Sequence, residues 1–417
     1  MLQRGKPESK DLGFALKGTS LTFLEKRETR NEKRSVPHRL LLRWSLAALA
    51  LPVIAIALLS THTARDYEKA TALLLATRNP DSRWLQLTAG RAEEKLVSIP
   101  GSSGPIRCRL YSPALSGAPG LVLAHGVHRL GIDEPRLMDL ARAFAGRGIV
   151  VMTPELIGLK NYRIDSSSIS AIGDAARALH QQLGAPVGVM GLSFAGGLAL
   201  MAAADARYQS DISSVIALGA YDDLARVTRF LATNEIELPD GKTGRIPAEQ
   251  YGALVLVYAH IEDFFPPQDF AGAREAIRLW LWEQYDAART QENSVSSASR
   301  QTLETLFRHE MDKLQPPLMA SIQLHAAQMQ RVSPRGHLGG VRAQVFLLHG
   351  ADDAVIPSSE TLWLARDVPA NHLAASLITP VISHVDTNYA PGFRSQWRLI
   401  SFMAHVFHQL EAEQAAH

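Results

Sequence analysis

The chain has 417 residues, 46% of them hydrophobic and 20% charged, which suits a globular protein with a large core and room for an insertion. The net charge is only +2, and residues 1–43 alone hold 11 Lys and Arg against 5 Asp and Glu. The remainder is slightly acidic, which argues against nucleic-acid binding by the folded body. The single cysteine, Cys108, excludes an intrachain disulfide and, on a predicted strand, is expected to be buried and inert.

The N-terminal region predicts a membrane anchor. Residues 1–39 are polar and charged, as in a disordered tail, and residues 40–62 form the expected transmembrane helix. The segment Trp44–Ser60 carries no charge and as a helix spans about 26 Å. Basic residues crowd its N-terminal flank, so the positive-inside rule predicts a cytoplasmic tail and a body on the outer side of the membrane. A buried core helix and a cleaved signal peptide are the alternatives.

The body alternates strands with helices. After a linker helix within residues 63–92, residues 93–221 and 342–417 are expected to form the core, and eight apolar or alternating runs read as strands. The predicted strands are 95–99, 106–111, 120–124, 149–153, 186–190, 214–219, 343–348 and 376–379. Such alternation predicts an α/β fold with a doubly wound, mostly parallel eight-stranded sheet, whose first two strands form an antiparallel pair.

One long segment breaks this rhythm. Residues 222–341 show helical patterns without alternating strands, which indicates a helical insertion between two strands of the sheet. Its aromatic residues either line a cavity or fill the core of the insertion itself; these are Phe264, Phe265, Trp280 and Trp282. Because the insertion leaves and rejoins the sheet beside its centre, we expect it to cover the strand ends and restrict access to them.

A short sequence between a predicted strand and a predicted helix carries the clearest chemical signal. It reads Gly191-x-Ser193-x-Ala195 and continues with Gly196, close to the G-x-S-x-G nucleophile elbow. In that turn small residues let strand and helix backbones approach closely, and the serine hydroxyl is exposed. The N–H of Phe194, at the start of the helix, is placed to face a developing oxyanion.

Candidate partners for the serine follow later strands. Asp352 and Asp353 come after the seventh predicted strand, and His384 comes after the eighth. In open α/β sheets the carboxyl ends of strands meet at one edge, where sites are built. A histidine base that is oriented by a carboxylate is what a serine hydroxyl requires to become nucleophilic. Composition alone leaves the choice between Asp352 and Asp353 open.

Together, the elbow, the stretch Gly350-x-x-Asp353-x-Val-x-Pro357 and the late histidine resemble the α/β-hydrolase fold family over residues 93–411. The resemblance implies Ser193 as nucleophile, Asp353 as acid and His384 as base, and it implies no metal or organic cofactor. It also implies an oxyanion hole made of the backbone N–H groups of Phe194 and Val127, and a cap formed by the insertion. Ala195 departs from the family pattern, which usually has glycine there.

The sequence thus predicts a hydrolase, anchored in the membrane through residues 44–60, that cleaves a small or lipid-like carboxylic ester, or an amide, through an acyl-Ser193 intermediate. A serine peptidase, an acyltransferase and a non-catalytic binding protein with the same fold are the alternatives.

His125 and His128 suggest a metal site, but no carboxylate ligand accompanies them, so His125 is expected to support its loop instead.

Overall fold

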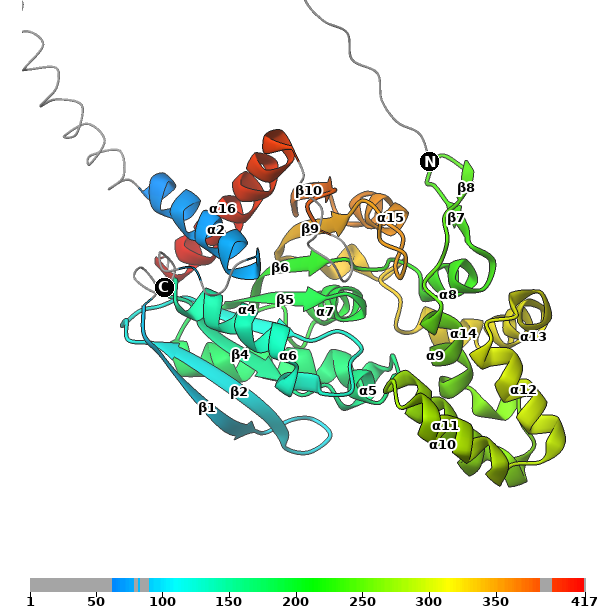
Figure 1. Cartoon of the computed structure of the whole chain (residues 1–417). Coiled ribbons are helices and arrows are strands. Elements are labelled where there is room, and N and C mark those ends of the chain that lie inside the picture. The colour runs from blue at the N-terminus through cyan, green and yellow to red at the C-terminus, as the bar shows by residue number, and fades with distance from the viewer. Residues whose placement is uncertain (1–61, 79–81, 83–89, 383–391, 416–417) are drawn as a thin grey trace, which may run out of the picture. The chain divides into compact units, whose positions relative to one another are not determined.

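A single mixed sheet organises the computed structural model, which describes residues 62–78, 82, 90–382 and 392–415. Within these residues the sheet has eight strands in the order β1-β2-β4-β3-β5-β6-β9-β10 (Figure 1). β2 is antiparallel to both of its neighbours, and the other neighbouring strands are parallel. The strands are β1 (Ala92–Ile99), β2 (Ile106–Pro113), β3 (Gly120–Ala124), β4 (Val150–Pro154), β5 (Val187–Leu192), β6 (Ile212–Leu218), β9 (Gln344–Gly350) and β10 (Leu373–Thr379). The predicted eight-stranded, mostly parallel sheet is confirmed.

The composition of each strand explains its place in the sheet. All residues of β3 and β4 are buried, because strands inside a sheet with helices on both faces are covered on both sides and are therefore mostly apolar. β1 lies at an edge and carries Glu93, Glu94 and Lys95 on an almost fully exposed strand. Charged side chains on an edge strand oppose pairing with other chains.

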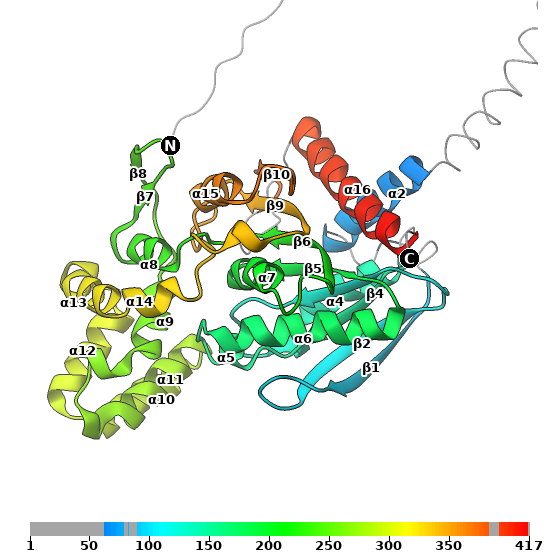
Figure 2. The ribbon, with the colours of Figure 1, turned by 180° about the vertical axis from the view of Figure 1, so that it is seen from behind.

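Helices cover both faces of the sheet, as Figures 1 and 2 show from opposite sides. α6, α7 and α15 pack on one face, and α4 and α16 pack on the other. Their bounds are α4 (Pro135–Ala145), α6 (Ser166–Leu183), α7 (Phe194–Ala204), α15 (Ser359–Asp367) and α16 (Phe393–Ala415). This arrangement is the doubly wound architecture that strand–helix alternation predicts.

The helix expected as a linker, α2 (His62–Arg78), is attached to the body. It packs on α16 and α4, where Ala70 and Leu73 are buried. The Tyr67 ring stacks on Trp397 with centroids 5.3 Å apart, and Lys69 forms an ion pair with Glu411. These contacts fix α2 on the face of the molecule formed by α4 and α16.

The predicted membrane span, residues 40–62, lies outside the described residues except for His62. Among the helices that the structure describes, none has both the length and the apolar character that crossing a bilayer requires. The span and the preceding basic tail therefore remain predictions from the sequence.

Between β6 and β9 the chain forms a mostly helical insertion. Its α-helices are α8 (Leu224–Thr233), α9 (Tyr251–Ala259), α10 (Phe270–Leu281), α11 (Tyr285–Gln291), α12 (Ser297–Phe307), α13 (Met311–Leu324) and α14 (Ala326–Gln330). A short hairpin that the sequence analysis did not predict, β7 (Glu235–Glu237) with β8 (Thr243–Arg245), follows α8. Trp280 stacks on Phe307 with centroids 4.0 Å apart, so at least this aromatic side chain packs within the insertion itself.

A buried ion cluster fixes the point where the insertion leaves the sheet. The Arg226 guanidinium donates to Glu360 Oε1 over 2.6 Å and to Asp222 Oδ2 over 2.9 Å. Glu360 Oε2 also accepts the backbone N–H groups of Asp222 and Asp223. Both Asp222 and Glu360 are fully buried, so the start of α8 is held to α15 by charges that water does not screen.

Candidate active site

The turn between β5 and α7 holds Ser193 in a strained conformation. Its φ of 55° and ψ of −129° lie outside the regions that side chains other than glycine usually occupy. The neighbours have to be small: a Cβ at Gly191 would lie 2.4 Å from the carbonyl oxygen of Ala195, and one at Gly196 would lie 2.7 Å from Ala220 Cβ. Close packing against the backbone at Ala195 and against the Ala220 side chain therefore maintains the turn.

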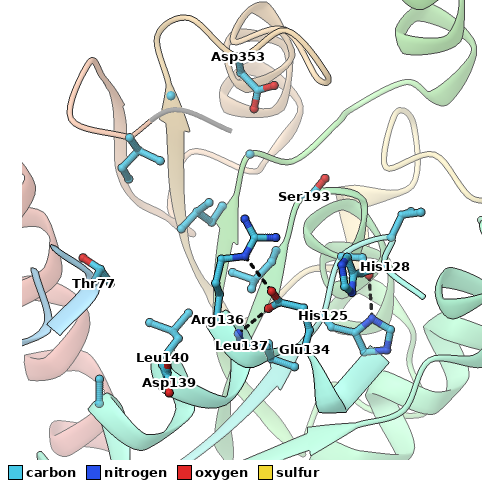
Figure 3. A pocket seen from close by; sticks show the side chains of 18 of the residues that line it. Thr77, His125, His128, Glu134, Arg136, Leu137, Asp139, Leu140, Ser193 and Asp353 are labelled. Atoms are coloured by element: carbon cyan, nitrogen blue, oxygen red, sulfur yellow. Dashed lines mark hydrogen bonds and ion pairs between the residues drawn. The ribbon is translucent and has the colours of Figure 1, made fainter. Parts of the chain in front are cut away.

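Backbone hydrogen bonds hold Ser193 in this turn while its side chain faces a cavity. Its N–H donates to the carbonyl of Leu218 on β6 over 2.7 Å, and its carbonyl accepts the N–H of Gly196 over 2.8 Å. The Ser193 side chain is partly exposed and lines a cavity of about 660 Å³ (Figure 3). The geometry presents a hydroxyl on a rigid support to a space large enough for a small organic substrate.

Asp353 lines the same cavity and is 2% exposed. Its Oδ1 accepts the backbone N–H groups of Val355 and Ile356 at 2.8 and 2.9 Å, which fixes the orientation of the carboxylate. A Cβ built on Gly219 would lie 3.6 Å from Asp353 Oδ2 and 4.0 Å from Ser193 Cα. Ser193 and the Asp353 carboxylate thus lie close together beside Gly219, whereas Asp352 is exposed and does not line the cavity.

Two backbone N–H groups beside Ser193 have no acceptor among the residues that the structure describes. They belong to Val127 and to Phe194, the first residue of α7. The loop that carries Val127 approaches Ser193 closely, since a Cβ on Gly126 would lie 3.3 Å from Ser193 Cβ. Unpaired amide donors on both sides of a serine hydroxyl can stabilise a negatively charged oxygen.

His125 holds this loop in place. Its Nδ1 donates to the Gly126 carbonyl over 2.7 Å, and its Nε2 accepts the N–H of Leu156 over 3.0 Å. Burial lowers the pKa of His125, so the ring stays neutral, as this pair of hydrogen bonds requires. With both nitrogens engaged, His125 has no lone pair for a metal, and the alternative of a site shared with His128 fails.

His384, the predicted base, lies outside the described residues. Ile382, two residues earlier, lines the cavity. The structure therefore brings together Ser193, Asp353 and the amides of Val127 and Phe194, and the role of His384 stays a prediction.

Most of the remaining cavity wall comes from elements that the sequence analysis did not connect with the site. One side of α4, together with Glu134 just before it, and the last turn of α2 contribute to it; their residues include Ala76, Thr77, Glu134, Arg136, Leu137, Leu140 and Ala143. Figure 3 shows Glu134 paired with Arg136, and the two side chains are joined over 2.7 Å. Burial alone would raise the pKa of Glu134, but hydrogen bonds from Arg136 and the Leu137 N–H lower it overall, so the carboxylate is ionised at neutral pH.

The insertion contributes less to the cavity than its position suggests. Among the described residues that line the cavity, only Tyr251 at the start of α9 belongs to it. Phe264, Phe265, Trp280 and Trp282 do not line it. No local pattern distinguishes Tyr251 from the other aromatic residues, because its position depends on how α9 lies beside the loop that carries Asp353.

Comparisons with known proteins show structural likeness only. No protein-family model matches the chain, and no curated protein sequence is similar to it. An acylaminoacyl peptidase of Pyrococcus horikoshii superimposes with a TM-score of 0.47 at 11% identity, over 79% of this chain and 43% of the peptidase. An esterase of Pyrobaculum calidifontis superimposes with a TM-score of 0.43 at 16% identity, over 83% of this chain and 90% of the esterase. The chain thus spans less than half the length of the peptidase, and its own residues have to supply the evidence for its chemistry.

Proposed function

We propose that the chain is a serine hydrolase of the α/β-hydrolase fold that cleaves a carboxylic ester through an acyl-Ser193 intermediate. One observation carries the proposal: Ser193 occupies a strained strand-to-helix turn at a cavity, flanked by two amide N–H groups without acceptors and by a buried, oriented carboxylate. A serine that only terminates a strand requires neither a positive φ nor unpaired donors beside it. Backbone strain of this kind is typical of functional sites.

In the proposed mechanism His384 accepts the Ser193 proton as Oγ attacks the substrate carbonyl carbon. The N–H groups of Val127 and Phe194 stabilise the oxyanion, and Asp353 orients the histidine and stabilises its protonated form. His384 then protonates the leaving alcohol as the ester bond breaks. In the second half of the reaction His384 deprotonates water, which attacks the acyl carbon of the acyl-enzyme. His384 then returns the proton to Ser193 Oγ as the acyl–oxygen bond breaks, so the acid and free Ser193 are released.

The cavity wall favours a substrate with an apolar acyl group. Aliphatic side chains dominate the part between Ser193 and α2, among them Leu137, Leu140 and Leu192. Charge enters this wall through the Glu134–Arg136 pair and through Asp139, which is itself paired with Arg142. A pocket of mainly apolar side chains with few polar groups is the usual form of a small-molecule site, so we propose a small or lipid-like ester rather than a strongly charged one.

We also propose that residues 44–60 anchor the chain in a membrane with the body on the outer side. Their lack of charge and the basic excess before them support this topology. Protease added to intact cells or spheroplasts should digest the body and spare a tag at residue 1. Protection of the body would reverse the topology without affecting the proposed chemistry.

Labelling with a fluorophosphonate probe tests the enzyme assignment on the full chain in detergent. The wild type should react with the probe, whereas Ser193→Ala should not be labelled. The turnover of p-nitrophenyl esters by Ser193→Ala should be about 10⁶-fold lower than that of the wild type. Ester, amide and peptide substrates assayed in parallel, with and without an added alcohol acceptor, separate esterase, peptidase and acyltransferase. A folded wild type that neither labels nor turns over any substrate would instead favour a binding protein.

A further inference from the structure

A cluster of metal-ligating side chains lies in the insertion, away from the Ser193 cavity. His260 follows α9, Glu262 lies in the short 3₁₀ helix η2 (Ile261–Asp263), and His325 joins α13 to α14. One ligand atom from each residue lies within 4.8 Å of the other two. None of the three residues lines the cavity that contains Ser193, so the proposed hydrolysis does not account for them.

A neighbouring carboxylate orients one of the histidines. Asp263 Oδ2 lies 2.9 Å from His325 Nε2 and accepts the Ser321 hydroxyl over 2.6 Å. A proton held on Nε2 by Asp263 leaves the lone pair of Nδ1 available on the other side of the ring. Metal-binding histidines usually have such a partner, because it fixes the tautomer and makes the free nitrogen more basic.

The other histidine has an unused ring. The His260 imidazole makes no hydrogen bond with any described residue, although it is only partly exposed. It stacks on His325 with ring centroids 3.7 Å apart and an angle of 19° between the planes. Because a metal lies in the plane of each ring that binds it, a shared ion requires His260 to turn about its Cβ–Cγ bond, and no hydrogen bond to the described residues opposes that turn.

We propose that His260, Glu262 and His325 bind a divalent transition-metal ion of the zinc class. Two imidazole nitrogens and one carboxylate oxygen are a ligand set that zinc accepts, with water in the fourth position. Glu262 is exposed, so water can reach the cluster. The ion would join the end of α9 to the α13–α14 junction, which are 65 residues apart in sequence, and so stabilise the insertion.

Cobalt absorption and zinc titration of the metal-free full chain in detergent test this proposal. One equivalent of Co²⁺ should give the visible d–d bands of a four-coordinate site, and Zn²⁺ should displace it. Glu262→Gln, an exposed and conservative change, should weaken Zn²⁺ binding at least tenfold, and Asp263→Asn should weaken it 10- to 100-fold. His260→Ala and His325→Ala should each abolish the cobalt bands.

The matched control is His337→Gln. His337 lies in the same insertion, but its Nδ1 is engaged with the Ser333 carbonyl at 2.9 Å and it is not part of the cluster. This variant should bind Zn²⁺ like the wild type. Absence of cobalt bands in the folded wild type, or equal Zn²⁺ affinity in the wild type and in Glu262→Gln and Asp263→Asn, would overturn the proposal and leave the His325–Asp263 contact as an ordinary hydrogen bond.

Discussion

Two turns leave neighbouring strands of the sheet and are held in different ways. β5 and β6 are parallel neighbours, so the turn into α7 and the turn into α8 lie at the same edge of the sheet. Small residues and backbone contacts fix the first turn, in which Gly191 has no room for a side chain. Buried charge fixes the second, through Arg226 between Asp222 and Glu360.

The two turns therefore have different roles: the first presents reactive groups to the cavity, and the second attaches the insertion to the core. A turn held by shape leaves the hydroxyl of Ser193 and the amides of Val127 and Phe194 available to a substrate, because none of them is used to stabilise the fold. A turn held by ion pairs uses most of its polar groups on one another; among the carboxylate oxygens of Asp222 and Glu360, the buried Asp222 Oδ1 alone has no hydrogen-bond partner in the described part of the chain. We therefore expect changes near the first turn to alter turnover and changes near the second to alter stability.

After the loss of Ser193 itself, the largest effect is expected at the carboxylate that faces the first turn. Asp353→Asn should lower turnover about 10³- to 10⁴-fold, because an amide cannot hold the histidine in the required tautomer. Asp352→Asn is the matched control: Asp352 is adjacent but exposed, and its change should cost little. Steady-state kinetics of both variants with one p-nitrophenyl ester show which aspartate supports turnover. A larger loss of turnover for Asp352→Asn would contradict the assignment of Asp353 as the acid.

At the second turn the expected effect is on stability. Glu360→Ala removes one carboxylate from the buried Arg226 and the acceptor of two backbone N–H groups, of which that of Asp222 is buried and that of Asp223 partly buried. Breaking a buried ion pair typically lowers the free energy of unfolding by about 3–5 kcal/mol. Glu304→Ala is the control, because it breaks the exposed Arg308–Glu304 pair of the insertion. It should lower the free energy of unfolding by at most about 1 kcal/mol. Urea denaturation of both variants measures the difference, and equal midpoints would refute it.

The same cluster should make stability depend on pH. Burial, followed by the proximity of Glu360, raises the pKa of Asp222 from 3.8 to about 7 in the folded protein. Between these two pH values the unfolded chain has lost the proton that the folded chain keeps, so stability should fall as pH rises through this range. We expect a loss of ~2–4 kcal/mol between pH 4 and pH 7 from this group.

Denaturation curves of the wild type and Asp222→Asn across this pH range isolate the contribution. The substitution should make the dependence flatter, since asparagine does not titrate. Asp223→Asn, which preserves the side-chain cap of α8, is the control for removing a neighbouring carboxylate. A slope that is unaffected by Asp222→Asn would show that Asp222 is ionised in the folded protein.

The smallest expected effect is on the stability of the first turn, at Ser193. Ser193→Gly should raise the free energy of unfolding by about 1 kcal/mol, because glycine adopts a φ of 55° without the strain that a Cβ introduces. Ser193→Ala keeps the Cβ, so it should remove activity without this gain. Thermal denaturation of the two inactive variants compares them directly, and a less stable glycine variant would mean that the turn stores no strain.

How much of the fold and of the candidate site the sequence predicts depends on how far apart in sequence the interacting residues lie. The β5–Ser193–α7 turn is encoded by adjacent residues, and strand–helix alternation predicts the mainly parallel sheet. Arg226 and Glu360 are 134 residues apart, and His260 and His325 are 65 apart, so no local spacing pairs them. The sequence also does not predict that Ala76, Thr77 and Tyr251 line the cavity, because they reach it only when α2 and α9 pack against the core.

The insertion also has a consequence for the order in which the molecule folds. β6 and β9 pair directly, with Ser214 opposite Gln344, although 130 residues separate them. Bringing distant segments together costs conformational entropy before any strand pairing compensates for it, and this slows folding. At the two ends of the insertion, the hydroxyl of Tyr221, the residue just before it, donates to the Val332 carbonyl over 2.6 Å. The Arg335 N–H donates to the Asp222 carbonyl over 3.0 Å, so the two ends are tied together. An insertion that collapses first therefore shortens the effective loop, and we expect it to act as a folding nucleus without which β9 and β10 join the sheet late.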